Sequence, residues 1–188
     1  MHNKTRKLVF YALFAALTCI CSQIAIPLPG DVPLSLATFA VMLSGALLGR
    51  FGGAVSMVVY VLLGVVGVPV FAGFRGGADR VLGPTGGYII GYIFMALVIG
   101  LLISVWGSNF FASAIAMFAG TVVCYLFGTV WYMLSTGTAF FPAIMACVIP
   151  FLPGDAIKIL LASFCSGRLQ QMVKLSVKDS KIKQKEVS

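Results

Sequence analysis

The chain has 188 residues, of which 60% are hydrophobic and only 10% are charged, and its mean hydropathy is +1.05. Soluble domains carry about 25% charged residues, so this composition excludes a soluble domain and predicts an integral membrane protein. The formal net charge is +8, but the basic residues gather near the two ends of the chain, which indicates orientation in a membrane rather than binding to nucleic acid.

Six apolar runs are candidates for membrane-spanning helices, and the breaks between them fall at Gly, Pro or small polar residues. The basic first residues lead directly into a run of full spanning length, so we expect no cleavable signal peptide. The expected spans are residues 8–30, 34–49, 54–72, 85–106, 110–134 and 141–169.

The expected fold is therefore an all-α six-transmembrane-helix bundle. Residues 1–169 would form this single membrane domain, and residues 170–188 would be a Lys-rich cytoplasmic tail, disordered or frayed from residue 174 onward. Residues 31–33 are expected to form a short loop and residues 50–53 a tight turn. The last span contains three prolines in its first half, so we expect it to be broken or kinked there.

The distribution of Lys and Arg predicts the orientation. With six spans, both termini lie on one side, and that side holds ten basic residues against only Arg75 and Arg80 on the other. Because positively charged loops stay in the cytoplasm, we expect a multi-pass protein of the cell membrane with both termini cytoplasmic.

Residues 68–92, called the glycine-rich segment below, contain seven Gly and two Pro between two apolar runs. Glycine permits close backbone approaches, and backbone N–H groups freed in this way can bind ligand oxygens. The segment would face outward, where its two arginines oppose the charge bias, so we interpret it as a binding loop; a loop that binds nothing is the alternative. Its candidate binding residues are Arg75, Gly76, Gly77, Asp79, Arg80, Thr85, Gly86, Gly87 and Tyr88.

Asp155 and Lys158 form the second candidate site. Opposite charges three residues apart share one helix face, and this pair would lie in the outer half of the hydrocarbon layer. Ionisable side chains at that depth usually face a bundle interior or a water-filled cavity. The pair is either an internal ion pair that fixes helix packing or one side of a ligand pocket.

Small residues in the first span, Ala12, Ala15 and Ala16, form a strip suited to close helix contact, either within the molecule or with a partner. The five cysteines are scattered and the single histidine is His2, so we expect neither a metal site nor a bound cofactor. The chain offers no carboxylate pair and no Ser/His/Asp set, which argues against an enzyme.

Three motifs carry a family resemblance: Val68-Pro-Val-Phe-Ala-Gly73, Gly83-Pro-Thr-Gly-Gly-Tyr88, and Pro153-Gly-Asp155-x-x-Lys158. Together with the six apolar segments, they resemble the BioY family, the substrate-binding S components of energy-coupling factor (ECF) biotin transporters. The resemblance extends over about residues 8–169 and implies capture of biotin near the outer surface. It also implies partners: a transmembrane coupling subunit, which the alanine strip would contact, and two cytoplasmic ATPases that drive toppling of the S component in the lipid.

The resemblance further implies roles for individual residues. Asp155 would accept hydrogen bonds from the ureido group of biotin, and Lys158, with Arg75 or Arg80, would pair with the carboxylate or stabilise Asp155. The glycine-rich segment would close as a lid, and Tyr88 would line the bicyclic ring. Which of Asp155 and Lys158 contacts which end of biotin stays open at this point.

Two other functions are compatible with the sequence. The same scaffold would serve as an S component for another vitamin, such as thiamine or riboflavin. A membrane scaffold protein whose Ala and Gly strips only bind other helices is the alternative outside transport.

Overall fold

The computed structural model describes residues 3–27 and 32–186, and the side chains of residues 4–27 and 32–170. Five helical stretches in this part of the chain are long and apolar enough to cross a membrane. In chain order the helices are α1 (Asn3–Gln23), α2 (Ala37–Val65), α3 (Ala78–Leu82), α4 (Gly86–Trp106), α5 (Phe110–Thr136), α6 (Phe140–Cys147), the 3₁₀ turn η1 (Ile149–Phe151) and α7 (Leu152–Glu186). The fourth and fifth expected spans thus agree closely with α4 and α5.

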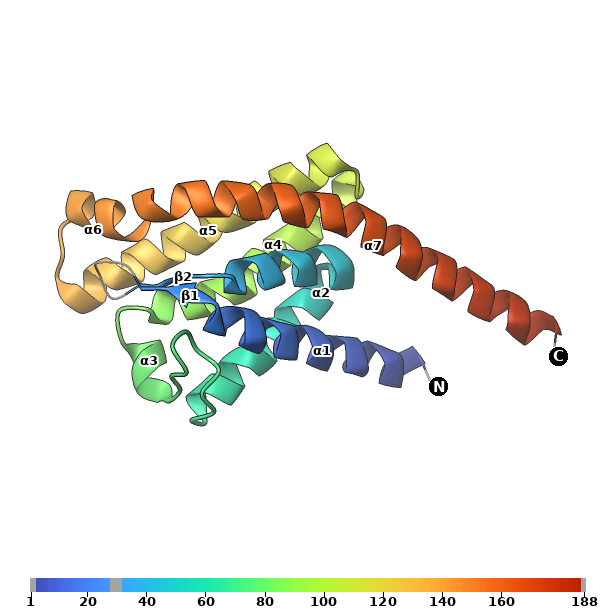
Figure 1. The fold of residues 1–188 in the computed structure, drawn as a ribbon, viewed down its shortest axis with the longest axis horizontal. Helices are drawn as coiled ribbons and strands as arrows, with labels where there is room; N and C mark the ends of the chain where they lie inside the picture. Colours follow the sequence, from blue (N-terminus) through green and yellow to red (C-terminus); the bar gives the residue numbers. More distant parts are fainter. Residues whose placement is uncertain (1–2, 28–31, 187–188) are drawn as a thin grey trace.

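Helix α2 folds back on itself at Gly49, which has φ 74° and ψ −179°. A Cβ atom on Gly53 would lie 2.9 Å from the Cα atom of Gly45, whereas an unbroken helix separates such residues by about 12 Å. The two arms, residues 37–48 and 50–65, therefore run beside one another, as Figure 1 shows. The five stretches thus contain six crossing segments, in agreement with the expected bundle. The turn precedes the expected residues 50–53, because the positive φ is easily adopted only by glycine.

Two expected spans end earlier than their apolar runs. Helix α1 ends at Gln23 and is followed by β1 (Ala25–Ile26), which pairs antiparallel with β2 (Leu34–Ser35). The expected end of this span falls partly on residues 28–31, which lie outside the described residues. The third span ends at Val65 rather than at residue 72. Both corrections have one cause: hydropathy cannot distinguish an apolar helix from apolar extended chain.

The last span is broken, as its prolines predict. Val148 and η1 separate α6 from α7. The prediction of a disordered or frayed tail from residue 174 onward is wrong for the described residues, because α7 continues as helix to Glu186. Residues 168–188 contain no Gly or Pro and are rich in Lys and Gln, which favour helix.

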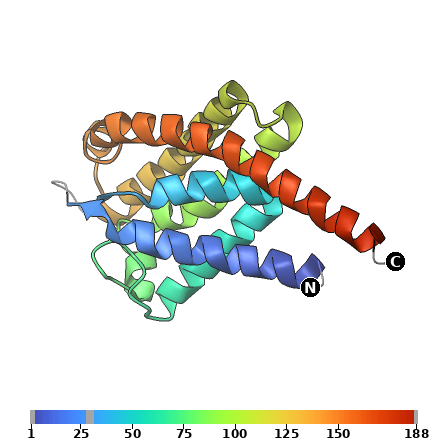
Figure 2. The same ribbon diagram turned by 45° about the vertical axis from the view of Figure 1, so that its right-hand side comes forward.

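Helix α4 lies at the centre of the bundle and packs against α2 and α5. Helix α1 covers α2, and α7 lies across α2 and α5. The two chain ends lie at one end of the bundle, while β1, β2, α3 and α6 lie at the opposite end (Figures 1 and 2). The glycine-rich segment is therefore at the end far from both termini.

Candidate functional site

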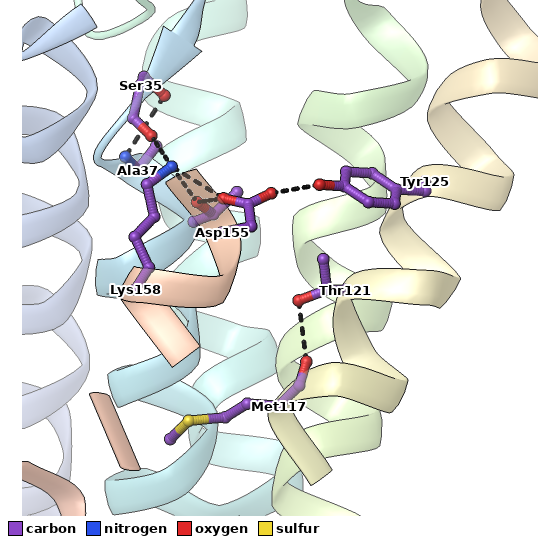
Figure 3. A network of polar contacts seen from close by, with 8 residues as sticks. Ser35, Ala37, Met117, Thr121, Tyr125, Asp155 and Lys158 are labelled. Carbon is purple, nitrogen blue, oxygen red and sulfur yellow. Dashed lines mark hydrogen bonds and ion pairs between the residues drawn. The ribbon is translucent and has the colours of Figure 1, made fainter. Parts of the chain in front are cut away.

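A buried ionic network lies where the first turn of α7 meets the start of α2 (Figure 3). Asp155 is 3% exposed and Lys158 is 8% exposed, and the Lys158 Nζ atom lies 2.9 Å from the Asp155 Oδ1 atom. The sequence spacing thus correctly placed the two charges on one helix face. The carboxylate also stands in the first turn of α7, where the helix dipole favours a negative charge.

Both charged groups have further partners from distant parts of the chain. Lys158 Nζ donates to the carbonyl oxygen of Ser35 at 2.6 Å and to Thr38 Oγ1 at 3.0 Å. Thr38 in turn donates to Asp155 Oδ1 at 3.2 Å. Tyr125 of α5 donates its hydroxyl to Asp155 Oδ2 at 2.5 Å (Figure 3). The network therefore joins α2, α5 and α7.

The two charged groups differ in how many of their hydrogen-bonding positions are occupied. An ammonium group has three donors, and in this structure Lys158 directs all three to Ser35, Thr38 and Asp155. A carboxylate offers about four acceptor positions, of which Lys158, Thr38 and Tyr125 occupy three. Asp155 therefore keeps capacity for another donor, whereas Lys158 is saturated.

Two adjoining cavities lie between this network and the glycine-rich segment. The inner cavity, of about 30 Å³, is lined by Thr38, Tyr125, Asp155 and Lys158 among others. The outer cavity, of about 70 Å³, is lined by residues of the glycine-rich segment. The residues common to both walls are Val32, Pro33, Ser35, Tyr88 and Tyr92. The two cavities therefore adjoin one another across these shared residues, the outer one at the glycine-rich segment and the inner one at Asp155.

The charged residues of the glycine-rich segment have different surroundings. Arg75 and Arg80 line the outer cavity. Asp79 pairs with Arg80, with 3.6 Å between Oδ2 and Nε, and its side chain is 73% exposed. Among the described residues, Asp79 is not part of either cavity wall. Its expected contact with a ligand therefore finds no support in this arrangement.

Thr85 and Tyr88 both line the outer cavity, and Tyr88 lines the inner one as well. The Tyr88 hydroxyl donates to the carbonyl oxygen of Cys147 at 3.0 Å. This hydrogen bond fixes the Tyr88 ring in the cavity wall, because its hydroxyl group is bonded to the backbone of α6. The expectation that Tyr88 lines the pocket agrees with this position.

The four candidate glycines belong to the framework of the site. A Cβ atom on Gly76 would lie 2.4 Å from the Val68 carbonyl oxygen, and one on Gly86 would lie 1.8 Å from that of Val81. On Gly87 it would lie 2.2 Å from Trp131 Cβ. Gly77 has φ 108° and donates its N–H to the Gly64 carbonyl. Their small size lets the segment fold tightly against α2, α4 and α5, and none of the four lines the cavities within the described chain.

The end of α1 holds the glycine-rich segment in place. Gln23 donates its amide to the carbonyl oxygens of Pro69 and Phe71, each at 3.3 Å, and accepts a bond from the Phe74 N–H at 2.8 Å. Ser22 donates to the Val70 carbonyl oxygen. On the far side of the segment, Trp131 Nε1 donates to the Gly83 carbonyl oxygen at 3.0 Å.

The alanine strip divides into two parts. Ala12 and Ala16 are exposed on α1. Ala15 is 2% exposed and packs inside with Tyr60 and Val61. The strip available to a partner therefore consists of Ala12 and Ala16 without Ala15.

Sequence reasoning missed Ser35, Thr38, Tyr92 and Tyr125 as residues of the site. Each belongs to an apolar run in which hydroxyl residues are common, and none is near Asp155 in the sequence. Thr38 is separated from Asp155 by 117 positions. The only signal was indirect: a buried ion pair needs further hydrogen-bond partners, but the sequence does not say which hydroxyls supply them.

Comparison with known proteins extends over nearly the whole chain. A sequence model of the BioY family matches residues 1–175. The chain is 38% identical over 167 residues to a probable biotin transporter BioY from Pyrococcus horikoshii, covering 89% of this chain and 98% of that protein. It is 39% identical over 169 residues to a biotin transporter BioY from Thermotoga maritima, covering 89% and 97%.

A solved structure is similar as well. It is the crystal structure of the S-component for biotin from an ECF-type ABC transporter, which matches with a TM-score of 0.84 at 29% identity and covers 91% of this chain and 95% of that one.

Proposed function

The chain belongs to the BioY family, a family of biotin transporters and not of enzymes, and we propose that this multi-pass membrane protein captures biotin as the substrate-binding subunit of an ECF-type transporter. The observation that carries the proposal is the buried Asp155–Lys158 network at the base of the paired cavities. Burying two charged groups costs desolvation free energy. Binding of a polar ligand to these groups explains why they are buried here.

Asp155 receives the ureido group of biotin. Its carboxylate has an acceptor position left, and it lines the inner cavity. The ureido group carries N–H donors, which an ionised carboxylate binds more strongly than a neutral acceptor does. Lys158 has no donor left in this arrangement, so its role is to pair with the Asp155 carboxylate and orient it.

The carboxylate of biotin then points toward the outer cavity. Arg75 and Arg80 line that cavity, and guanidinium groups bind carboxylates through paired hydrogen bonds. Burial of the bicyclic ring against Tyr88 and Tyr92 supplies the apolar part of the affinity. All contacts come from side chains of this chain, and no resident cofactor takes part.

The cavities must widen to admit a vitamin. Pockets for small ligands usually measure about 300–1,000 Å³, well above the 70 Å³ and 30 Å³ present here. The glycine-rich segment is the wall that moves, because its residues 68–77 form irregular chain between α2 and α3 rather than a helix. Hydrogen bonds from Gln23 and Ser22 and the packing of Phe71 against Tyr60 hold it in the closed position. It acts as a lid over the inner network.

A binding measurement tests this function. Isothermal titration of the purified protein with biotin is expected to show saturable binding, with thiamine and riboflavin unable to compete. Asp155→Asn is expected to weaken binding more than tenfold, since truncating one partner of a buried charge contact costs about 2–5 kcal/mol. Asp179→Asn, which makes the same change in the distal part of α7 at the end of the bundle far from the cavities, is the matched control and keeps wild-type affinity.

Absence of saturation up to micromolar biotin would refute the assignment of biotin. Tight binding of thiamine or riboflavin instead would favour an S component for another vitamin. A scaffold protein would show no thermal stabilisation by any of the three.

Transport requires partners, which we propose are the ECF coupling subunit and two cytoplasmic ATPases. Both chain ends lie at the end of the bundle opposite the lid (Figure 1), and the excess of Lys and Arg there favours a cytoplasmic position for both. Ala12 and Ala16 form the docking strip on α1. Ala16→Trp is expected to abolish co-purification of the ATPases, while Ala139→Trp, at an exposed alanine outside the strip, leaves it intact.

A further inference from the structure

A second polar surface lies at the end of the bundle that carries the termini. It is an open groove of about 690 Å³ between the start of α1 and the fold of α2 at Gly49. Its basic residues are Arg6 and Lys7 from α1 and Arg50 from the second arm of α2. Phe10, Tyr11, Leu47, Leu48 and Phe51 supply most of the apolar wall. Three positive charges from two elements thus meet in one groove.

No acidic side chain pairs with these charges in the part of the chain whose side chains are described. The ion pairs there involve Asp79 and Asp155, and neither includes a residue of this groove. The guanidinium groups instead lie over aromatic rings, Arg6 at 5.8 Å from the Phe10 ring centre and Arg50 at 4.8 Å from that of Phe51. Such stacking orients a guanidinium group and leaves its N–H donors available to an anion.

The fold of α2 sets the position of Arg50. The non-helical φ and ψ angles at Gly49 make Arg50 the first residue of the second arm. Gly52 allows the close approach of the two elements, because a Cβ atom there would lie 2.7 Å from the Tyr11 ring. The groove therefore lies at a close contact between α1 and the second arm of α2, which carries Arg50.

An apolar stripe leads away from the groove along the second arm of α2. This arm exposes Phe51, Val55, Val59 and Leu62, which share one helix face by their spacing. A ligand with an anionic head and a long apolar chain matches the groove with its head and the stripe with its chain.

The groove is separate from the surfaces already assigned. It lies at the other end of the bundle from Asp155 and the lid (Figure 2). Lys7 and Ala16 are nine residues apart, which places them on opposite faces of α1 at about 100° per residue. The groove therefore remains open to lipid when a partner contacts Ala12 and Ala16.

We propose that this groove binds the phosphate headgroup of an anionic membrane phospholipid, with Arg6, Lys7 and Arg50 as its ligands and the apolar stripe of α2 as the bed for its acyl chains. Basic pockets between membrane helices recognise anionic headgroups in this way. A bound lipid fixes α1 to the fold of α2 and sets the depth of this end of the bundle in the membrane.

Native mass spectrometry of the detergent-purified protein tests the proposal with phosphatidylglycerol, phosphatidylcholine and inorganic phosphate as separate probes. The wild type is expected to retain phosphatidylglycerol in preference to phosphatidylcholine. Arg6→Gln and Arg50→Gln are each expected to weaken this retention about fivefold, since a basic residue near an anionic surface contributes about 1 kcal/mol. Lys4→Gln removes the same charge from an exposed lysine of α1 outside the groove wall and is the matched control.

Biotin binding of each variant shows that it is folded, so failure of the lipid site and failure of the biotin site give different results. Equal retention of phosphatidylglycerol by the wild type and both arginine variants would overturn the proposal. So would equal retention of phosphatidylcholine, or displacement of the lipid by millimolar inorganic phosphate, which would identify a site for a soluble anion. Loss of ATPase co-purification in the arginine variants without any change in lipid retention would assign the groove to a protein partner instead.

Discussion

The buried ion pair makes a prediction in which one substitution does more harm than two. Lys158→Met removes the cation and leaves the Asp155 carboxylate, 3% exposed, with Thr38 and Tyr125 as its remaining partners among the described residues. Leaving a buried charge without its partner costs about 3–5 kcal/mol, and the Ser35 carbonyl oxygen also loses its donor. At about 2–4 °C per kcal/mol for a chain of this size, the midpoint of thermal unfolding is expected to fall by about 6–20 °C.

The double variant Asp155→Asn/Lys158→Met carries no unpaired charge, so it is expected to recover at least half of that loss. Cys124 and Cys147 are 2% and 1% exposed, so a thiol-reactive dye during a thermal ramp reports unfolding directly. Lys4→Met makes the same replacement at an exposed lysine and should leave the midpoint unchanged. Neither variant of the pair is expected to bind biotin normally, because one lacks the orienting cation and the other also lacks the carboxylate.

A double variant as unstable as Lys158→Met would show that the loss comes from packing and not from an unpaired charge. A Lys158→Met protein within about 2 °C of the wild type would show that water reaches the network.

Three further predictions concern the surroundings of the site. Gln23→Leu removes the hydrogen bonds that hold the glycine-rich segment, so labelled biotin should dissociate about tenfold faster in a chase experiment; an unchanged rate would argue against a lid. Tyr125→Phe removes a hydrogen bond to a buried carboxylate and should lower stability by about 1.5–3 kcal/mol, measured by the thiol-dye assay, and a wild-type midpoint would contradict the network. Gly87→Ala places a Cβ atom 2.2 Å from a side chain of α5 and should lower the unfolding midpoint by several degrees, whereas Gly154→Ala, whose nearest neighbours are 3.4 Å away, should not.

The chain order of membrane helices was predictable because its signals are local. Spanning length, turn residues and loop charge each act over a few neighbouring positions, and the boundaries of α4 and α5 agree with them. The ends of α1 and α2 were misplaced for the same reason: β1, β2 and residues 66–72 are as apolar as the helices before them. Their departure from helix depends on contacts with one another and with Gln23, which lie outside any local window.

The sequence by itself determined that this is a six-segment membrane bundle with a polar, glycine-rich interruption and one charged pair within a span. These features are readable in the sequence because a charged side chain or a helix break inside the lipid bilayer requires polar partners from the protein itself. Only the tertiary structure decided which residues supply those partners. It brought Ser35 of β2, Thr38 of α2 and Tyr125 of α5 to the pair, used every donor of Lys158, and left Asp155 with capacity for a ligand. It also separated residues of one motif, placing Arg80 at the cavity and its neighbour Asp79 in the open, because the direction of a side chain depends on which helices pack around it.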